Sequence, residues 1–193
     1  TFDDNNDFNQ LLKKYFDSKM NFKDKPDEFI WKDTKYEPDS FMNSWVKTFG
    51  IGEKIELKPE EDGTGVKIKL YKTSGDKNGR LLADEGYGIT SLFGILLKIE
   101  IAILTAKGVS ISRLLGNGLD KLDGYDSWKF HYEKQTIAIE EPEIHLHPRF
   151  QSLLADMMVY AYKKYNIHFI IETHSEYLIR KLQTLIAKKE IES

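Results

Sequence analysis

The C-terminal third of the chain alternates short apolar runs with amphipathic patterns, and this order restricts the fold more than any other feature. Residues 136–139 and 167–171 have the composition of buried strands, and helices are predicted at residues 149–165 and 175–189. A strand followed by a helix and then by another strand of the same sheet forms a parallel pair. The sequence therefore predicts an α/β fold with a parallel core.

The region before this core carries the patterns of a capped helix and an antiparallel hairpin. An apolar face ending at Phe49 predicts a helix with Asp39 as its N-cap and Gly50 as its end. Residues 54–58 and 66–71 alternate apolar and charged side chains on the two sides of a glycine-containing turn. Such alternation indicates antiparallel strands with one wet face, so we expect a hairpin layer that precedes the parallel core.

Two further helices and one irregular segment complete the predicted architecture. Residues 8–16 carry apolar side chains at helical spacing, and residues 89–106 are apolar enough to form a long helix that is buried on most sides. Residues 108–134 are rich in turn-forming residues, so no long element is expected there. We divide the chain into an N-terminal helical and hairpin segment, residues 1–80, and a core segment, residues 81–193.

Composition narrows the environment and excludes some kinds of site. The chain has no cysteine, which excludes disulfides and thiolate metal cages, and its formal net charge of −3 gives no global signature of nucleic-acid binding. The longest apolar run, residues 99–106, is interrupted by Glu100 and is too short to span a bilayer. We therefore expect a cytoplasmic protein without a membrane partner.

Two adjacent carboxylates, Glu140 and Glu141, end the first parallel strand and are followed by Pro142. By itself such a pair is most simply explained as a solvated acidic turn. However, neighbouring residues of a strand point to opposite faces, so one carboxylate can hold a hydrated metal ion while the other faces elsewhere. This arrangement suits the polarisation of a water molecule beside a metal-bound phosphate.

The residues around this pair carry a family resemblance. Residues 137–148, Ile-Ala-Ile-Glu-Glu-Pro-Glu-Ile-His-Leu-His-Pro, resemble the Walker B segment of ABC-type ATPases, especially of the RecF/SMC-like and OLD-like (overcoming lysogenization defect) groups. The resemblance implies that ATP and Mg²⁺ are used. It also implies that Glu140 holds Mg²⁺ through water, where the family usually has Asp, and that Glu141 is the catalytic carboxylate.

A lone histidine, His174, follows the second parallel strand. A histidine in such a place is more often a structural hydrogen-bonding group than a ligand-binding one. Here it lies one strand–helix unit beyond the acidic pair, which resembles the order in which ABC-type ATPases place their switch histidine. The resemblance implies that His174 senses the γ-phosphate, to which an imidazole can donate a hydrogen bond from either ring nitrogen.

A glycine-containing segment, residues 83–91, precedes the long apolar helix. Glycines at a helix start let backbone N–H groups approach an anion, although two glycines alone are usually a turn. The segment resembles the ABC signature loop in the Asp-x-Gly-x-Gly form of OLD-like proteins. The resemblance implies contacts to a nucleotide held by a second subunit, made by Asp84, Gly86, Gly88, Ile89 and Thr90.

No Gly-x-x-x-x-Gly-Lys-Ser/Thr phosphate loop occurs in the 193 residues. We therefore expect the C-terminal lobe of an ABC-type ATPase, with the phosphate loop upstream in a parent protein, and negligible hydrolysis by this chain alone. The resemblance further implies a homodimer that closes around ATP. A nuclease domain, DNA and a role in phage defence are the family-level expectations for its partners and biology.

Two alternatives remain open from the sequence. One is a nucleotide-dependent binding or regulatory module with little hydrolysis. The other is a metallohydrolase that uses His145, His147 and nearby carboxylates without nucleotide. The two histidines lie two residues apart, so on an extended segment they would face one side. Under the ATPase interpretation, the acidic pair and His174 should meet at the carboxyl edge of the parallel strands, and the signature loop should lie well away from them.

Overall fold

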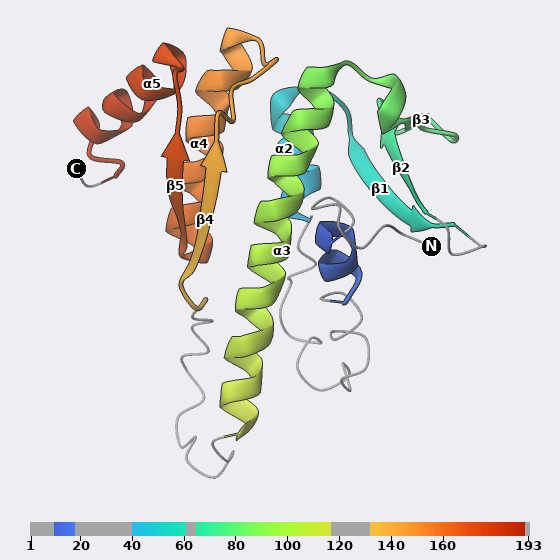
Figure 1. Ribbon diagram of the computed structural model, residues 1–193, viewed down its shortest axis with the longest axis horizontal. Coiled ribbons are helices and arrows are strands. Elements are labelled where there is room, and N and C mark those ends of the chain that lie inside the picture. The colour runs from blue at the N-terminus through green and yellow to red at the C-terminus, as the bar shows by residue number, and fades with distance from the viewer. Residues whose placement is uncertain (1–9, 18–39, 61–64, 117–131, 192–193) are drawn as a thin grey trace.

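The computed structural model describes residues 10–17, 40–60, 65–116 and 132–191, which form two small sheets and several helices around one long helix. Residues 10–17 are helical. The remaining elements are α2 (Phe41–Phe49), β1 (Lys54–Pro59), β2 (Val66–Tyr71), β3 (Arg80–Leu81), a 3₁₀ turn η1 (Leu82–Asp84), α3 (Tyr87–Gly116), β4 (Gln135–Glu140), α4 (Pro148–Tyr165), β5 (Ile167–Glu172) and α5 (Glu176–Ala187). Helix α3 runs between the β1–β2–β3 sheet and the layer made by β4, β5, α4 and α5 (Figure 1).

The parallel core is confirmed. Strands β4 and β5 pair in parallel, and the register runs from Gln135 opposite Ile167 to Glu140 opposite Glu172. Helix α4 makes the crossover between them, so both strands end at the same edge of the sheet. The sequence order strand–helix–strand–helix therefore gives the expected mixed α/β architecture.

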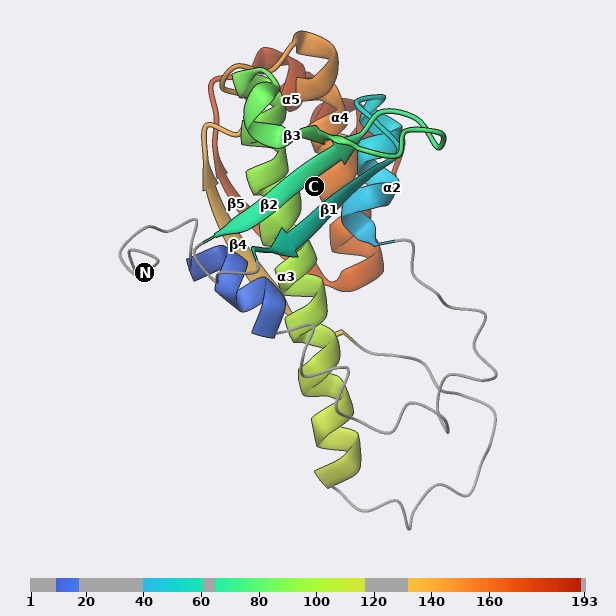
Figure 2. The same ribbon diagram turned by 90° about the vertical axis from the view of Figure 1, so that its right-hand side faces the viewer.

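The antiparallel hairpin is confirmed as well. Strands β1 and β2 pair from Lys54 opposite Tyr71 to Pro59 opposite Val66, and β3 adds a short third strand to β2. Most of the expected turn, residues 61–64, lies outside the described residues. In Figure 2 this sheet lies in front of α3, which agrees with the separate layer predicted from the alternating side chains.

Helix α2 has a different N-cap from the one predicted. Its N-cap is Ser40, whose hydroxyl accepts from the backbone N–H of Asn43 at 3.2 Å, and Asp39 lies outside the described residues. The end was predicted correctly, since Gly50 adopts the left-handed conformation with φ 71°. A second acceptor comes from α3, where the buried carboxylate of Glu100 accepts from the Met42 N–H at 2.9 Å. Glu100 therefore interrupts the apolar run in order to satisfy the start of α2.

Helix α3 is longer than predicted. It continues through residues 108–116, which the sequence analysis placed in a turn-rich segment. Glycine and serine are poor helix formers, but a helix that has already formed gains one hydrogen bond for each added residue. The segment Tyr87–Ala106 is long and apolar enough to cross a membrane, which the shorter run 99–106 did not suggest. Of its most apolar 18-residue stretch, 61% is buried inside the protein, as in the core helix of a globular domain.

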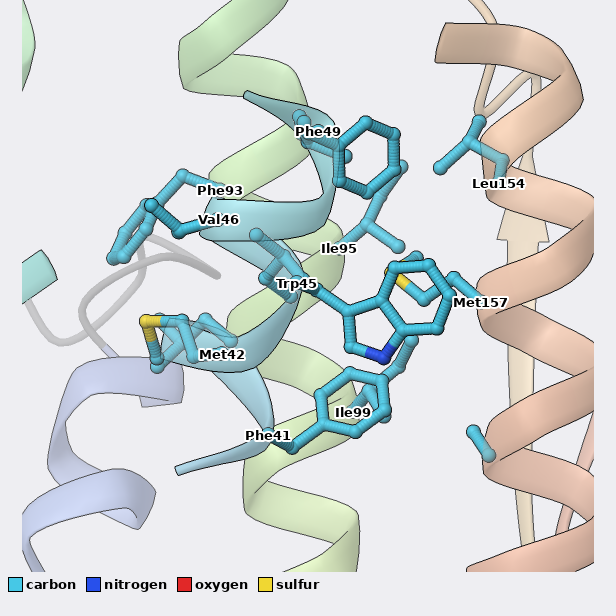
Figure 3. Packing of buried hydrophobic residues seen from close by; sticks show 14 of the residues in the cluster. Phe41, Met42, Trp45, Val46, Phe49, Phe93, Ile95, Ile99, Leu154 and Met157 are labelled. Carbon is cyan, nitrogen blue, oxygen red and sulfur yellow. The ribbon is translucent and has the colours of Figure 1, made fainter. Parts of the chain in front are cut away.

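The core includes the side chains where α2 packs against α3 and α4 (Figure 3). Trp45 and Phe49 point from α2 toward Met157 and Leu154 of α4, while Phe93 lies on the α3 side. Phe49 also meets the Phe150 ring edge-on, with centroids 5.4 Å apart. These contacts join the N-terminal elements to the helix that follows the acidic pair, so the two sequence segments share one hydrophobic core.

Candidate functional site

Strands β4 and β5 end side by side, and acidic residues mark that edge. Glu140 lies opposite Glu172 in the last pair of the register, and both are exposed. Ligands of open α/β sheets bind outside the carboxyl ends of the strands. The structure thus gives this edge two solvent-facing carboxylates, of which sequence analysis identified only Glu140.

Glu141 leaves the strand in a left-handed conformation, with φ 44°. Its backbone N–H donates to the Glu172 carbonyl at 2.7 Å, which holds the first residue after β4 against the end of β5. Its Oε1 atom lies 3.7 Å from Nε2 of His174, which follows β5. The side chains are 43% and 79% exposed, so their mutual attraction is weak. The relevant observation is their position, because the side chains of Glu141 and His174, the two predicted catalytic groups, lie close together and are both accessible to solvent.

The turn from Glu141 to His147 is held by its own backbone. The N–H of Ile144 donates to the Glu141 carbonyl at 3.1 Å, and the N–H of Leu146 donates to the Glu143 carbonyl at 3.0 Å. The backbone of His145 is also in the left-handed conformation, with φ 62°, which residues other than glycine seldom adopt. Leu146 is buried and anchors the turn in the core.

Glu143 joins this turn to the segment after β5. Its Oε1 atom accepts from the backbone N–H of His174 at 2.6 Å, across 31 residues of sequence. Burial opposes ionisation, but hydrogen bonds from the Thr173 hydroxyl and from backbone N–H groups, including those of His174 and Ser175, outweigh it and lower the pKa of Glu143 below its ordinary value. The carboxylate therefore remains a charged acceptor at neutral pH. No role for Glu143 was predicted from the sequence.

A second link between the two segments comes from Gln151 in the first turns of α4. Its side-chain amide donates to the Leu146 carbonyl at 2.9 Å, and its carbonyl oxygen accepts from the Ser175 hydroxyl at 2.6 Å. Ser175 is buried and is the N-cap of α5, because its hydroxyl oxygen accepts from the Leu178 N–H at 3.1 Å. The segment that carries His174 is thus fixed at the His174 backbone and at the residue that follows it.

The two histidines of the His-x-His motif have different surroundings. Nδ1 of His147 accepts from the Arg149 N–H at 3.3 Å, so this side chain is the N-cap of α4. The exposed ring of His145 lies beside the ring of Tyr87, with centroids 5.8 Å apart. Among the residues that the structure describes, no group of three or more His, Asp or Glu side chains is arranged to hold a metal ion. The metallohydrolase alternative therefore gains no structural support.

The glycine-containing segment before α3 packs against the turn that follows the acidic pair. A Cβ atom added to Gly88 would lie 2.5 Å from the His145 carbonyl oxygen, so the two backbones are in close contact. This loop was expected to lie well away from the acidic pair, yet it contacts residues only four and five positions beyond Glu141. Gly86 and Asp84 are exposed at the surface of the same segment.

Two features define the geometry of this loop further. The Lys72 ammonium at the end of β2 lies 2.9 Å from a carboxylate oxygen of Glu85, which is 11% exposed, and this ion pair ties the loop to the antiparallel sheet. The backbone N–H groups of Ile89 and Thr90 donate to the Gly86 carbonyl at 2.9 and 3.3 Å. These two N–H groups are therefore engaged in the first turn of α3.

Replacing Gly88 by Ala tests the close approach of the two backbones. Alanine is the better helix former by about 1 kcal/mol, so in open space this change would stabilise the protein. Here the new methyl group meets backbone, and we expect a loss of about 1–3 kcal/mol in the free energy of unfolding, measured by urea denaturation. Gly94→Ala is the matched control, because nothing lies within 4 Å of its added Cβ. Stabilisation by both changes would contradict the contact.

Comparison with known proteins assigns the chain to a family. Residues 3–179 match the model of a family described as an AAA ATPase domain, so the chain belongs to this family and the expected membership of an ATPase family is confirmed. One similar solved structure, from a study of ATP-driven dimerization and DNA-stimulated activation of SMC ATPases, is 13% identical, with a TM-score of 0.45 over 72% of this chain and 77% of that chain. A search of curated proteins gave no match.

Proposed function

We propose that this chain is the catalytic C-terminal lobe of an ABC-type ATPase in which Glu141 and His174 act on the γ-phosphate of ATP. The observation that carries the proposal is the 3.7 Å approach of Glu141 Oε1 to His174 Nε2 at the carboxyl edge of two adjacent parallel strands. Membership of the AAA ATPase domain family supports nucleotide as the substrate. The branch, RecF/SMC-like or OLD-like, rests on the motifs alone.

The two side chains have separate tasks in this proposal. The Glu141 carboxylate orients the attacking water molecule or accepts its proton, which requires that it stay ionised and partly exposed. The imidazole of His174 donates a hydrogen bond to the γ-phosphate, so it reports whether that group is present. Because both lie at the same edge, the water molecule held by Glu141 and the γ-phosphate contacted by His174 would lie side by side.

The acidic edge fits a hydrated magnesium ion. Mg²⁺ prefers oxygen ligands and keeps several waters, binding through one or two carboxylates and the substrate phosphates. Glu140 is exposed at the end of β4, and Glu172 lies opposite it, so either carboxylate would hold the ion through water. When bound, the ion supplies neutralisation of the charge on the phosphate oxygens.

We place the remaining contacts to ATP outside this chain. The phosphate loop would come from an upstream segment of a longer protein, since the 193 residues contain no such motif. The loop with Asp84, Gly86 and Gly88 would approach a nucleotide held by a second subunit, and ATP would thereby close a homodimer. DNA, a nuclease domain and phage defence are the partners and the role that the resemblance suggests.

The proposal is tested by comparing this chain with the full-length protein. We expect negligible ATP hydrolysis by the 193-residue chain and measurable hydrolysis by the full-length protein. The full-length protein should also dimerise when ATP is added, which light scattering measures. The 193-residue chain should be inactive because the backbone N–H groups and the lysine of a phosphate loop make most of the contacts that bind the β- and γ-phosphates. Dimerisation without hydrolysis would favour a regulatory module instead. Robust turnover by the 193-residue chain, abolished by Glu141→Gln, would show that no other phosphate loop is needed.

A further inference from the structure

The side chain of His174 is largely exposed and makes few contacts that could hold it in place. Contacts to the backbone of this residue therefore set its position. The imidazole is 79% exposed, and its neighbour Glu141 Oε1, at 3.7 Å, lies beyond direct hydrogen-bonding distance. An exposed pair of this kind contributes little to holding either side chain in place. Another group must therefore determine where His174 lies relative to Glu141.

Glu143 makes the shortest contact to the backbone of His174. Its carboxylate oxygen accepts the His174 N–H at 2.6 Å, and a hydrogen bond to a charged acceptor is about twice as strong as one between neutral groups. Glu143 lies in the same hydrogen-bonded turn as Glu141, two residues further on. One short turn therefore carries both the candidate catalytic carboxylate and the group that holds the histidine.

The residue after the histidine is held from the same side. The Ser175 hydroxyl donates to Gln151 at 2.6 Å, and Gln151 in turn donates to the Leu146 carbonyl at the end of the acidic turn. Ser175 is buried and Gln151 is half-buried, so this link is partly shielded from water. One contact is made to the His174 backbone and the other to the neighbouring Ser175. Both connect this segment to the turn that begins at Glu141.

We infer that Glu143 is a positioning residue that holds His174 beside Glu141 through the His174 backbone, with Gln151 as its support. The inference rests on the proposed roles of Glu141 and His174. A positioning residue acts by keeping reacting groups in register, and small displacements of such groups reduce catalysis strongly. Glu143 itself would not touch the nucleotide, since its Oε1 atom accepts from the His174 N–H and its Oε2 atom is buried.

The first test is structural and needs no nucleotide. In the 193-residue chain, the imidazole NMR signal of His174 is assigned by its loss in His174→Ala, and its sensitivity to Glu141 is calibrated with Glu141→Gln. Glu143→Ala should shift this signal in the same direction as Glu141→Gln and should speed amide exchange of the His174 N–H by about tenfold or more. Glu143→Gln keeps an acceptor oxygen and should restore both readouts.

A nearby carboxylate provides the matched control. Glu176 lies two residues beyond His174, is 77% exposed and pairs with Arg180 at 3.2 Å. Glu176→Ala should leave the His174 signal and its amide exchange unchanged. If Glu143→Ala lowers the folded fraction, Glu143→Asp replaces it, because the shorter side chain keeps the charge but withdraws the oxygen. Unchanged His174 readouts in the folded variant would overturn the inference.

The second test separates positioning from the proposed function. In the full-length protein, Glu143→Ala should lower kcat by about tenfold or more while KM for ATP changes little, and Glu143→Gln should recover most of the loss. A shifted His174 signal with unchanged kcat would preserve the positioning contact but contradict the proposed role of His174. A lower kcat without any change at His174 would contradict positioning by Glu143.

Discussion

Replacing Glu141 by Gln is expected to abolish ATP hydrolysis by the full-length protein while ATP binding is preserved. The amide keeps the shape of the carboxylate but cannot accept a proton or carry the charge that orients water. Removal of a general base typically lowers the rate by about 10²–10⁴-fold. Because ATP would still bind but not be hydrolysed, the closed dimer should accumulate. Steady-state turnover, nucleotide binding and light scattering measure the three effects.

Two further variants distinguish the roles at this edge. Glu140→Gln should weaken the Mg²⁺-dependent step, so that half-maximal turnover needs a higher Mg²⁺ concentration, because its exposed carboxylate is the proposed metal-side group. His174→Ala should impair the response to the γ-phosphate with a smaller effect on nucleotide affinity. If Glu141→Gln kept near-normal turnover while Glu143→Gln lost it, the catalytic carboxylate would instead lie two residues later in the chain.

Replacing Phe49 by Ala should be among the most destabilising single changes in the described core. Phe49 is 1% exposed and ends α2, where its ring meets Phe150 of α4 at 5.4 Å and Trp45 at 6.0 Å. Deleting a buried phenylalanine ring typically costs about 3–5 kcal/mol, because transfer energy is lost and a cavity remains. We expect this loss in the free energy of unfolding, measured as a lower urea midpoint with an unchanged slope.

An exposed aromatic residue controls for the loss of a ring. Tyr177 of α5 is 52% exposed, so Tyr177→Ala should change the free energy of unfolding by less than about 0.5 kcal/mol. Similar effects of the two substitutions would mean that Phe49 does not hold α2 against α4. A steeper or shallower slope in Phe49→Ala would instead indicate a change in cooperativity, because the slope follows the surface exposed on unfolding.

The architecture of the C-terminal third was predictable because its signals are local. Apolar runs of strand length separated by an amphipathic helix predict a parallel pair, and the observed β4–β5 register confirms it. The end of α2 at Gly50 was also predictable, since a glycine tolerates the left-handed backbone there. The prediction failed where local and cooperative effects compete, as in residues 108–116, which continue α3 despite their poor helix propensity.

The side-chain directions of Glu140 and Glu141 could be predicted from strand alternation only up to the residue where the strand ends. Alternation along a strand predicted that Glu140 and Glu141 face opposite sides, which holds only if both residues belong to the strand. In the structure, β4 ends at Glu140, and Glu141 takes a left-handed conformation with φ 44°. The direction of the Glu141 side chain is therefore set by the turn and by the hydrogen bond from the Glu141 backbone N–H to the Glu172 carbonyl. The alternation of side chains along a strand predicts neither of these features.

The sequence by itself determined that two parallel strands end close to Glu141 and His174, and therefore that these residues lie at one edge, because strand order and helix crossover follow from hydrophobic periodicity. Only the tertiary structure decided that Glu143 reaches the backbone of His174, 31 residues away, and that Gly88 packs against His145. Contacts of this kind depend on backbone conformations that non-glycine residues rarely adopt and on the folding of distant segments around one core. No local pattern encodes them, although they position the groups proposed to act on ATP.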